Sequence, residues 1–274
     1  MDVLSADWLG ICRRAVAAQR RIFDEVRGVE ARTVYEGIGE GGDRSLAIDR
    51  RCEEAVFAEL DGLAAAGASF LAISEERGEV GFGAGGPARV VIDPIDGSLN
   101  ARRTVPSHSL SVAIASGPSM ADVELAYVYD FGAGEEFVAR RGAGATLDEA
   151  PIRVGADGEG LELLGVESAE PARTLPLVEA LAGRVYRLRV VGSIAITASY
   201  VAAGRFDGML SLRPCRSVDA AAAQLIVREA GGVVAFGDLA PSEAGLALDA
   251  RYPIAAAAGE RSLATIRAAV ESTE

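Results

Sequence analysis

The segment at residues 90–100, VVIDPIDGSLN, constrains the fold more than any other part of the sequence. Three β-branched apolar residues in succession, from Val90 to Ile92, predict a buried strand. This strand runs directly into Asp93 and Asp96, which are separated by a proline and an isoleucine. A buried strand needs other elements to cover both faces of its sheet. Two carboxylates at the end of such a strand also indicate a chemical role for these acids.

Helix and strand patterns alternate on both sides of this segment. Apolar residues at helical spacing predict helices over residues 5–29, 46–66, 193–203 and 219–230. Apolar runs predict strands over 70–74, 89–93 and 208–212, a meander of strands over 109–140, and a glycine-rich loop over 37–43. Periodicity is lost over 148–160, so we expect a mixed α/β (α+β) chain with domains over 1–149 and 150–274.

Charge and composition narrow the classes of partner. The 274 residues carry a formal net charge of −13, which leaves no basic face to bind nucleic acid or an anionic membrane. No apolar run is long enough to cross a bilayer, and the N-terminal residues lack the positive charge of a signal peptide. Cys12, Cys52 and Cys215 form no C-x-x-C pair, so we expect reduced thiols and a cytoplasmic protein.

Carboxylates are the side chains on which chemistry in this chain has to rest. His108 is the only histidine, which argues against triads and multi-histidine metal sites, and we expect it to be structural or at the surface. The Asp-Pro-Ile-Asp sequence can aim both aspartates and the Ile95 carbonyl into one cavity. Clustered acids repel one another unless cations lie between them, and oxygen-only ligands favour Mg²⁺. Backbone N–H groups at Gly97-Ser98 would offer a seat for an anion, so the segment predicts metal-assisted phosphate-ester chemistry.

Each of these signals also has a purely structural interpretation. Asp-Pro and Asp-Gly pairs occur in ordinary turns, and Glu75-Glu76 could be the solvated end of a strand. Asp219 could favour a helix N-terminus through the helix dipole. The joint order of the signals along the chain, rather than any one of them, favours a functional site.

Four segments together resemble the signature blocks of the inositol monophosphatase family. They are ISEER at 73–77, VVIDPIDGSLN at 90–100, VVGSIAITASYVAAGRFDG at 190–208 and SVDAAAAQLIVREAGG at 217–232. The segments at 35–49 and 210–222 most resemble archaeal-type members that act on both inositol monophosphate and fructose 1,6-bisphosphate. The resemblance implies the layered αβαβα sandwich of that family and a homodimer.

The resemblance also implies a role for each matching residue. Glu75, Asp93 and the Ile95 carbonyl match a first metal site, and Asp93, Asp96 and Asp219 match a second. Asp49 and Ser98 match the pair that positions and activates a water, and Glu75 also serves a third metal site, which gives two or three Mg²⁺ per subunit. The Gly97 and Ser98 amides match the phosphate seat, and Gly192 and Ser193 match the contact with the alcohol part of the substrate.

Arg213 is a further candidate, on its chemistry alone. Its fork-shaped donor set could hold a second phosphate of the substrate, and a surface ion pair is the alternative. Departures from the family pattern remove no metal ligand: they are Ser98 for threonine, Val218 and Ala101 for aromatic residues, and Ala223 and Ser74 for glycines.

The expected function is therefore that of an Mg²⁺-dependent phosphomonoesterase, with inositol 1-phosphate and fructose 1,6-bisphosphate as leading substrates. A nucleotidase of the 3′-phosphoadenosine type and a histidinol phosphatase are the alternatives within the same chemistry. A non-catalytic relative that keeps the fold for binding or scaffolding is the alternative of a different class.

Overall fold

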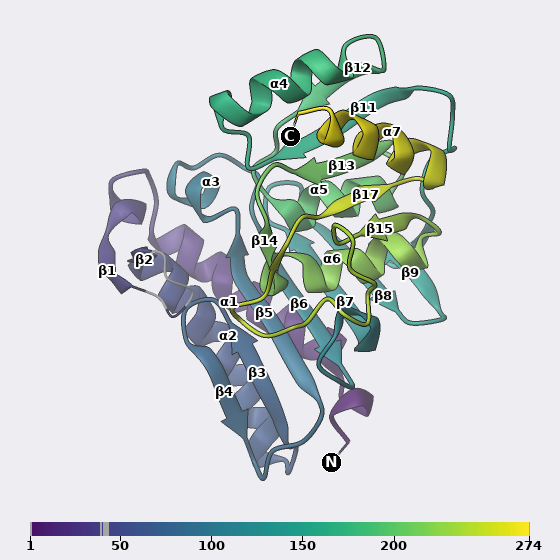
Figure 1. The fold of residues 1–274 in the computed structure, drawn as a ribbon. Coiled ribbons are helices and arrows are strands. Elements are labelled where there is room, and N and C mark those ends of the chain that lie inside the picture. Colours follow the sequence, from purple (N-terminus) through teal and green to yellow (C-terminus); the bar gives the residue numbers. More distant parts are fainter. Residues whose placement is uncertain (1, 39, 41–43, 274) are drawn as a thin grey trace.

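The chain folds into five layers that alternate between helices and sheets. The computed structural model describes residues 2–38, 40 and 44–273, so Gly39 and residues 41–43 of the predicted glycine-rich loop lie outside the described residues. The larger sheet has eight strands and the smaller has five. Figure 1 shows helices outside the larger sheet, between the two sheets and outside the smaller sheet. The predicted αβαβα sandwich is confirmed.

Helices α1 (Trp8–Glu25) and α2 (Ala47–Ala65) cover one face of the larger sheet. Helix α1 is shorter than the helix predicted over 5–29, because the Asp7 side chain accepts a hydrogen bond from the Gly10 N–H and so fixes the start of the helix. Residues Val3–Ser5 form a separate 3₁₀ turn, η1, before it. A hairpin of β1 (Tyr35–Ile38) and β2 (Arg44–Leu46) connects the two helices.

The eight-stranded sheet has the order β10-β9-β8-β7-β6-β5-β3-β4. Its strands are β3 (Phe70–Ser74), β4 (Gly78–Phe82), β5 (Arg89–Asp96), β6 (Ser109–Ala115), β7 (Val123–Asp130), β8 (Glu135–Arg140), β9 (Gly144–Leu147) and β10 (Ala150–Ile152). Only β3 and β5 run parallel in the described pairings of this sheet, and β6, β7 and β8 form the predicted antiparallel meander.

Strand β5 extends further than the sequence predicts. We expected it to end at residue 93 and to give way to a turn, but it continues to Asp96. Its register against β6 slips within this stretch, since Asp93 lies opposite Ser111 and Asp96 lies opposite Ser109. Pro94 has no N–H to donate to the ladder, so the Asp-Pro-Ile-Asp sequence forms a bulge within the strand rather than a turn beyond it.

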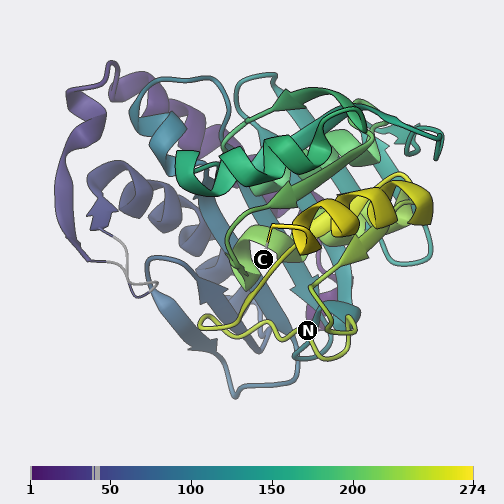
Figure 2. The same ribbon diagram turned by 45° about the horizontal axis from the view of Figure 1, so that its top comes forward.

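The five-stranded sheet has the order β12-β11-β13-β17-β15. It contains β11 (Leu161–Glu167), β12 (Val185–Arg189), β13 (Gly208–Ser211), β15 (Val233–Ala235) and β17 (Ala255–Ala257). Between the two sheets lie α5 (Ile194–Ala202) and α6 (Ser217–Glu229), the latter starting two residues before its predicted start. The outer helices α4 (Pro171–Leu181) and α7 (Glu260–Glu271) cover the far face, as Figure 2 shows.

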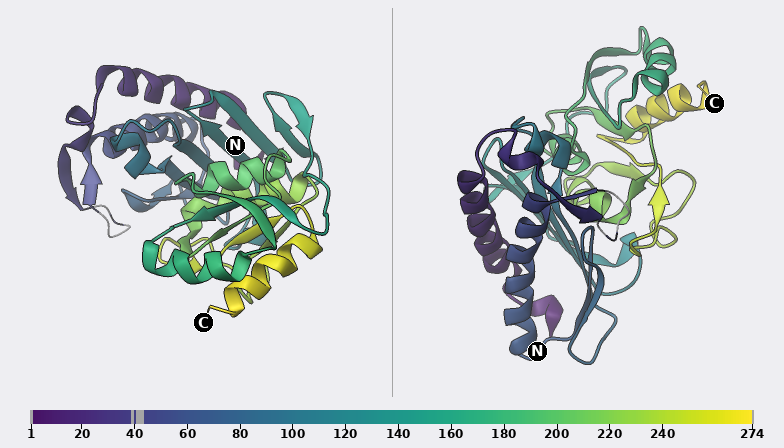
Figure 3. Two further views of the ribbon diagram at one scale, coloured as in Figure 1. Left: turned by 90° about the horizontal axis from the view of Figure 1, so that it is seen from above. Right: turned by 90° about the vertical axis from the view of Figure 1, so that its left-hand side faces the viewer.

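Three large apolar clusters fill the spaces between the layers. One joins α1 and α2 to the eight-stranded sheet, and another joins the five-stranded sheet to α4 and α7. The largest lies between the sheets around α5 and α6, where the run Ala220–Ala223 is fully buried and its small side chains let both sheets approach the helix. Figure 3 shows α1 and α2 on the opposite side of the molecule from α4 and α7. The domain boundary near residue 150 stays a prediction.

Two short segments complete the frame of the site. Helix α3 (Ser98–Arg102) follows β5 directly, and the two-residue strand β14 (Cys215–Arg216) leads into α6 and pairs with β16 (Arg251–Tyr252). All three cysteines are buried free thiols. Within the described residues, the structure holds no helix of the length and apolar character that a bilayer crossing requires.

Candidate active site

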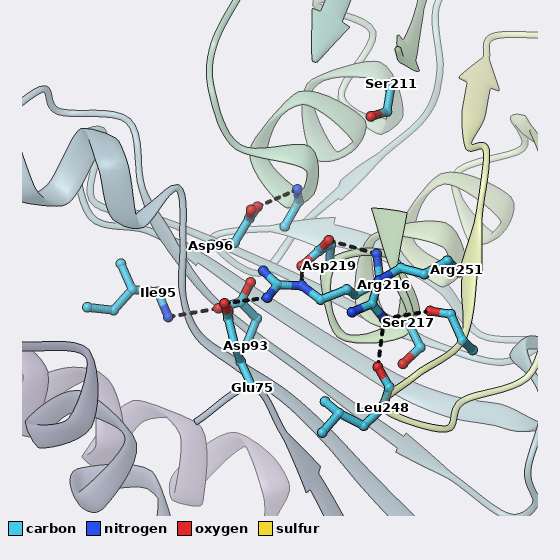
Figure 4. Close-up of polar contacts among 12 residues, drawn as sticks. Glu75, Asp93, Ile95, Asp96, Ser211, Arg216, Ser217, Asp219, Leu248 and Arg251 are labelled. Carbon is cyan, nitrogen blue, oxygen red and sulfur yellow. Dashed lines mark hydrogen bonds and ion pairs between the residues drawn. The ribbon is translucent and has the colours of Figure 1, made fainter. Parts of the chain in front are cut away.

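The predicted residues meet at a cavity of about 450 Å³. Strands β3 and β5 end there, and helices α5 and α6 begin there. The predicted residues that line it are Glu75, Asp93, Ile95, Asp96, Gly97, Ser98, Gly192, Ser193 and Asp219. Side chains from strands of the larger sheet and from the helices between the sheets therefore meet at this cavity. Figure 4 shows this for the acids.

The bulge in β5 is held from behind by buried groups. The Ile95 N–H donates a 3.0 Å hydrogen bond to Asp93 Oδ1, and the fully buried Gln19 donates through Nε2 to the Pro94 carbonyl at 3.1 Å. The Ile95 side chain packs in a small apolar cluster with Phe23, Leu46, Ile48, Cys52 and Ala101. These contacts fix the backbone that carries Asp93 and Asp96.

Asp96 is held by the start of helix α5. Its Oδ2 accepts a 2.5 Å hydrogen bond from Ser193 Oγ and a 2.6 Å hydrogen bond from the Ala195 N–H. A carboxylate at a helix N-terminus is also favoured by the helix dipole. Ser193 was predicted to contact the substrate; the structure places its hydroxyl against Asp96 and against the Ile196 N–H, for which it is the cap.

The two glycines of the predicted substrate site allow a close approach of two loops. Gly97 has φ 90°, and a Cβ there would lie 2.9 Å from the carbonyl oxygens of both Gly192 and Ser107. Gly192 has φ 84°, and a Cβ there would lie 2.6 Å from Asn100 Nδ2. Asn100 joins the loops, because its Nδ2 donates to the carbonyls of Ser107 and Val191 at 2.8 Å each.

Arg216 lies among the acids on the other side of the cavity, and the sequence reasoning missed it. Its Nη1 is 2.5 Å from Glu75 Oε1, and its Nε is 3.5 Å from Asp219 Oδ1. Its backbone N–H also donates to Asp219 Oδ2 at 3.0 Å. A signal was available in the sequence, since an arginine three residues before a predicted metal-ligating acid at a helix start is close to that acid.

The acids raise one another's affinity for protons. Burial raises the pKa of Asp93 well above its ordinary value, and repulsion from Glu75, Asp96 and Asp219 raises it further. Burial also raises the pKa of Glu75 to about 8, against the lowering effect of Arg216. Burial and then Asp219 raise the pKa of Asp96 to about 7. Raised pKa values of neighbouring carboxyl groups show that their ionised forms repel one another, so a cation placed among them would stabilise the cluster.

The donor set of the cavity fits Mg²⁺. The candidate ligands are carboxylate oxygens and one backbone carbonyl, which hard cations prefer, and their mutual repulsion is what a divalent cation relieves. Glu75, Asp93, Asp96, Asp219 and the Ile95 carbonyl are the groups that would hold it. In the present arrangement of the described residues, no three His, Cys, Asp or Glu side chains converge closely enough to hold an ion, and the Arg216 guanidinium contacts two of the acids.

Asp49 and Arg213 do not lie among the described residues that line the cavity. Asp49 is buried in the first turn of α2, its Oδ1 has no hydrogen-bond partner in the described structure, and burial and then Glu76 raise its pKa to about 7. Arg213 forms an exposed ion pair with Glu170. The structure shows a surface ion pair for Arg213, and its contact with a second phosphate stays a prediction.

Glu167 is a second cavity residue that sequence reasoning missed. It is buried at the end of β11, and its carboxylate accepts hydrogen bonds from Thr197 Oγ1 at 2.6 Å and from the Gly192 N–H at 2.8 Å. Burial raises its pKa to about 7. Glu167 is the last residue of β11, and Glu75 comes directly after the last residue of β3; an acid at the end of an apolar strand was the available signal.

The single histidine is structural. His108 is buried against the rings of Phe23 and Phe131, whose centroids lie 4.9 and 5.5 Å from its own. Burial lowers its pKa to about 4, so the ring is neutral near neutral pH. It is not among the residues that line the acidic cavity, and this agrees with the structural role predicted for it from the sequence.

The sequence of this chain is similar to those of known proteins. The chain matches the profile of the inositol monophosphatase family over residues 11–274. A fructose-1,6-bisphosphatase/inositol-1-monophosphatase of Methanothermobacter thermautotrophicus is 31% identical over 83% of each chain, and one of Thermococcus kodakarensis is 34% identical over 86% of each. The Nus factor SuhB of Escherichia coli is 36% identical over 59% of this chain and 61% of its own.

Solved structures show the same fold. An inositol monophosphatase–fructose 1,6-bisphosphatase superimposes with a TM-score of 0.83 at 22% identity, covering 97% of this chain and 100% of the other. The extragenic suppressor protein suhB of Bartonella henselae superimposes with a TM-score of 0.78 at 26% identity, covering 96% and 98%. By its sequence profile, its relatives and its fold, the chain belongs to the inositol monophosphatase family, a family of phosphatases.

Proposed function

We propose that this chain is a hydrolase that releases phosphate from a small polyol or sugar phosphate with the help of Mg²⁺. The leading substrates are inositol 1-phosphate and fructose 1,6-bisphosphate. The observation that carries the proposal is the set of buried acids, Glu75, Asp93, Asp96 and Asp219, which share one cavity with the Gly97-Ser98 segment. A cation cluster beside an anion seat suits metal-assisted hydrolysis of a phosphate monoester.

In this proposal the four acids and the Ile95 carbonyl are the groups that would hold two or three Mg²⁺ per subunit. The bound metal would supply positive charge that acidifies a water and offsets the charge of the phosphate. The chain supplies position: Ser193 and Ala195 hold the Asp96 carboxylate, and the Gly97 and Ser98 amides receive the phosphate oxygens. The family resemblance assigns to Asp49 and Ser98 the positioning and activation of the attacking water; Ser98 lines the cavity, and Asp49 is buried in the first turn of α2, outside the described cavity lining.

The alcohol part of the substrate would face the loop at residues 190–193. Gly192 and Ser193 line the cavity there, and Asn100 and Glu167 fix the backbone of this loop through hydrogen bonds. The cavity volume of about 450 Å³ is in the range of small-ligand sites. We further propose a homodimer and a cytoplasmic location, where the three buried thiols stay reduced; light scattering of the purified protein tests the dimer.

A phosphate-release assay tests the proposed activity. The protein is assayed with Mg²⁺ and with EDTA on inositol 1-phosphate, fructose 1,6-bisphosphate, histidinol phosphate and adenosine 3′,5′-bisphosphate. We expect Mg²⁺-dependent release from one or both of the first two. Release confined to one of the last two would assign the histidinol phosphatase or the nucleotidase activity instead.

A binding or scaffolding role is the alternative from a different class. One relative, SuhB of Escherichia coli, is named as a Nus factor and not as a phosphatase. The retention of all proposed metal-ligating residues in the cavity favours catalysis for this chain. Absence of release from every substrate with Mg²⁺ present would favour the non-catalytic role.

A further inference from the structure

Arg216 neutralises the acid cluster from inside the cavity. Its guanidinium donates to Glu75 at 2.5 Å and lies 3.5 Å from Asp219. Figure 4 shows the three side chains side by side. The three side chains are only 18%, 15% and 11% exposed. Charge-assisted hydrogen bonds between largely buried groups are among the stronger polar contacts in a protein.

The same carboxylates are the proposed metal ligands. A Glu75 oxygen that accepts a 2.5 Å hydrogen bond from the guanidinium presents that lone pair to Arg216 and not to a cation. A guanidinium and a divalent cation on the same side of Glu75 would also repel each other strongly in this buried setting. Arg216 and a metal ion bound at Glu75 would therefore compete for the same carboxylate.

The backbone geometry allows the side chain alone to move. The Arg216 N–H donates to Asp219 Oδ2 at 3.0 Å. The Arg216 backbone also lies opposite that of Arg251 in the antiparallel pair of β14 and β16. The guanidinium, at the end of a long side chain, faces the open cavity that it lines. Release from Glu75 needs rotation about side-chain bonds and no change in the main chain.

We propose that Arg216 is an internal counter-cation, which holds Glu75 in the metal-free protein and competes with Mg²⁺ for it. The proposal rests on the proposed function, because it takes Glu75 and Asp219 as Mg²⁺ ligands. In the metal-free state Arg216 stabilises the fold, since buried acids without a positive partner are destabilising. In the metal-bound state it has left Glu75.

Calorimetric titration with Mg²⁺ tests the competition. Wild-type protein, Arg216→Met and Arg213→Met are stripped with EDTA, freed of the chelator and titrated in the same buffer at the same pH. Arg213→Met is a matched control, because Arg213 forms an exposed ion pair with Glu170 outside the described cavity lining. We expect Arg216→Met to bind Mg²⁺ roughly tenfold more tightly than wild type, and Arg213→Met to bind as wild type does.

Thermal unfolding adds a second readout. Without metal, Arg216→Met should unfold at a lower temperature than wild type, and saturating Mg²⁺ should close the gap. A measurement on the wild type covers the case in which the variant does not fold: exchange of the Arg216 Nη protons with water, followed by NMR, should become faster when Mg²⁺ saturates the protein.

The outcomes separate the two proposals. If the wild type takes up no Mg²⁺, the proposed function fails and the competition fails with it. If the wild type binds Mg²⁺, but Arg216→Met binds it no more tightly and the Nη protons keep their slow exchange, the counter-cation role alone is overturned.

Discussion

Ser193 Oγ donates a 2.5 Å hydrogen bond to Asp96 Oδ2 and accepts one of 3.2 Å from the Ile196 N–H. One hydroxyl thus caps helix α5 and holds a proposed metal ligand at the end of β5. The contact ties the helix between the sheets to the strand that carries the acids, so the position of Asp96 depends on both halves of the chain.

Ser193→Ala is expected to shift the pH dependence of phosphate release. The hydrogen bond from Ser193 lowers the pKa of Asp96, which burial holds near 7, so its loss raises that pKa further. Because protons compete with Mg²⁺ for this carboxylate, the acidic limb of the pH–rate profile at a fixed, subsaturating Mg²⁺ concentration should move upward. Ser199→Ala is the control, because the buried Ser199 hydroxyl on the same helix has no hydrogen-bond partner in the described structure. An unshifted profile in Ser193→Ala would contradict the assigned contact.

Asp49→Asn is expected to stabilise the metal-free protein while removing activity. The folded pKa of Asp49 is raised from 3.8 to about 7, so its ionisation destabilises the folded state progressively as pH rises through this range, and the loss is complete above it. At alkaline pH in EDTA the variant should unfold with a free energy higher by about 2 kcal/mol, and below pH 3.8 the difference should vanish.

Asp61→Asn, at an exposed position of the same helix, is the control for Asp49→Asn and should change the free energy of unfolding by less than about 0.5 kcal/mol. Urea unfolding across pH gives both values. A destabilised Asp49→Asn at alkaline pH would show that the carboxylate is stabilised by a partner.

Gly97→Ala is expected to lower both stability and activity. The positive φ of 90° strains any side chain, and the added Cβ would meet two backbone carbonyl oxygens at 2.9 Å. We expect a loss of about 2–3 kcal/mol in the free energy of unfolding. Gly85→Ala is the matched control, since φ is 80° and the Cβ would meet no described atom within 4 Å, so it should lose only about 1 kcal/mol. Equal losses in the two variants would contradict the close approach of the loops.

Glu167→Gln is expected to raise the KM more than it lowers the kcat. The carboxylate accepts from the Val191 and Gly192 N–H groups and from Thr197, and an amide cannot accept all three hydrogen bonds. The loop that faces the alcohol part of the substrate should loosen, and the KM should rise about tenfold. Glu162→Gln, at an exposed position of the same strand, should leave both constants unchanged. A lower kcat at constant KM would instead place Glu167 in the chemical step.

The sequence predicts the layered fold and most of the acidic cavity, because both depend on local patterns that tertiary contacts reinforce. The apolar run Val90–Ile92 is buried as expected, and Asp93 and Asp96 face the cavity. The resemblance to a family placed Glu75, Asp219 and Gly192 near them, although more than a hundred residues separate some of these positions.

What the sequence leaves open is decided by packing between distant elements. The continuation of β5 through Pro94 follows from pairing with β6, which strand propensity alone does not indicate. Arg213 and Arg216 are equally plausible cations by type, and the end of strand β14 turns Arg216 toward the acids while Arg213 pairs with Glu170. The hydroxyl of Ser193 binds Asp96 because α5 begins beside the end of β5.

The substitution Asp96→Asn tests the central claim most directly. Mg²⁺-dependent phosphate release by this variant is compared with that of the wild type, and urea unfolding in EDTA checks that the fold is kept. If Asp96 holds catalytic Mg²⁺, release falls to the level of the wild type without metal, while the unfolding transition stays cooperative and no weaker. Near-normal turnover by Asp96→Asn in Mg²⁺ would contradict the claim that this carboxylate cluster carries the chemistry.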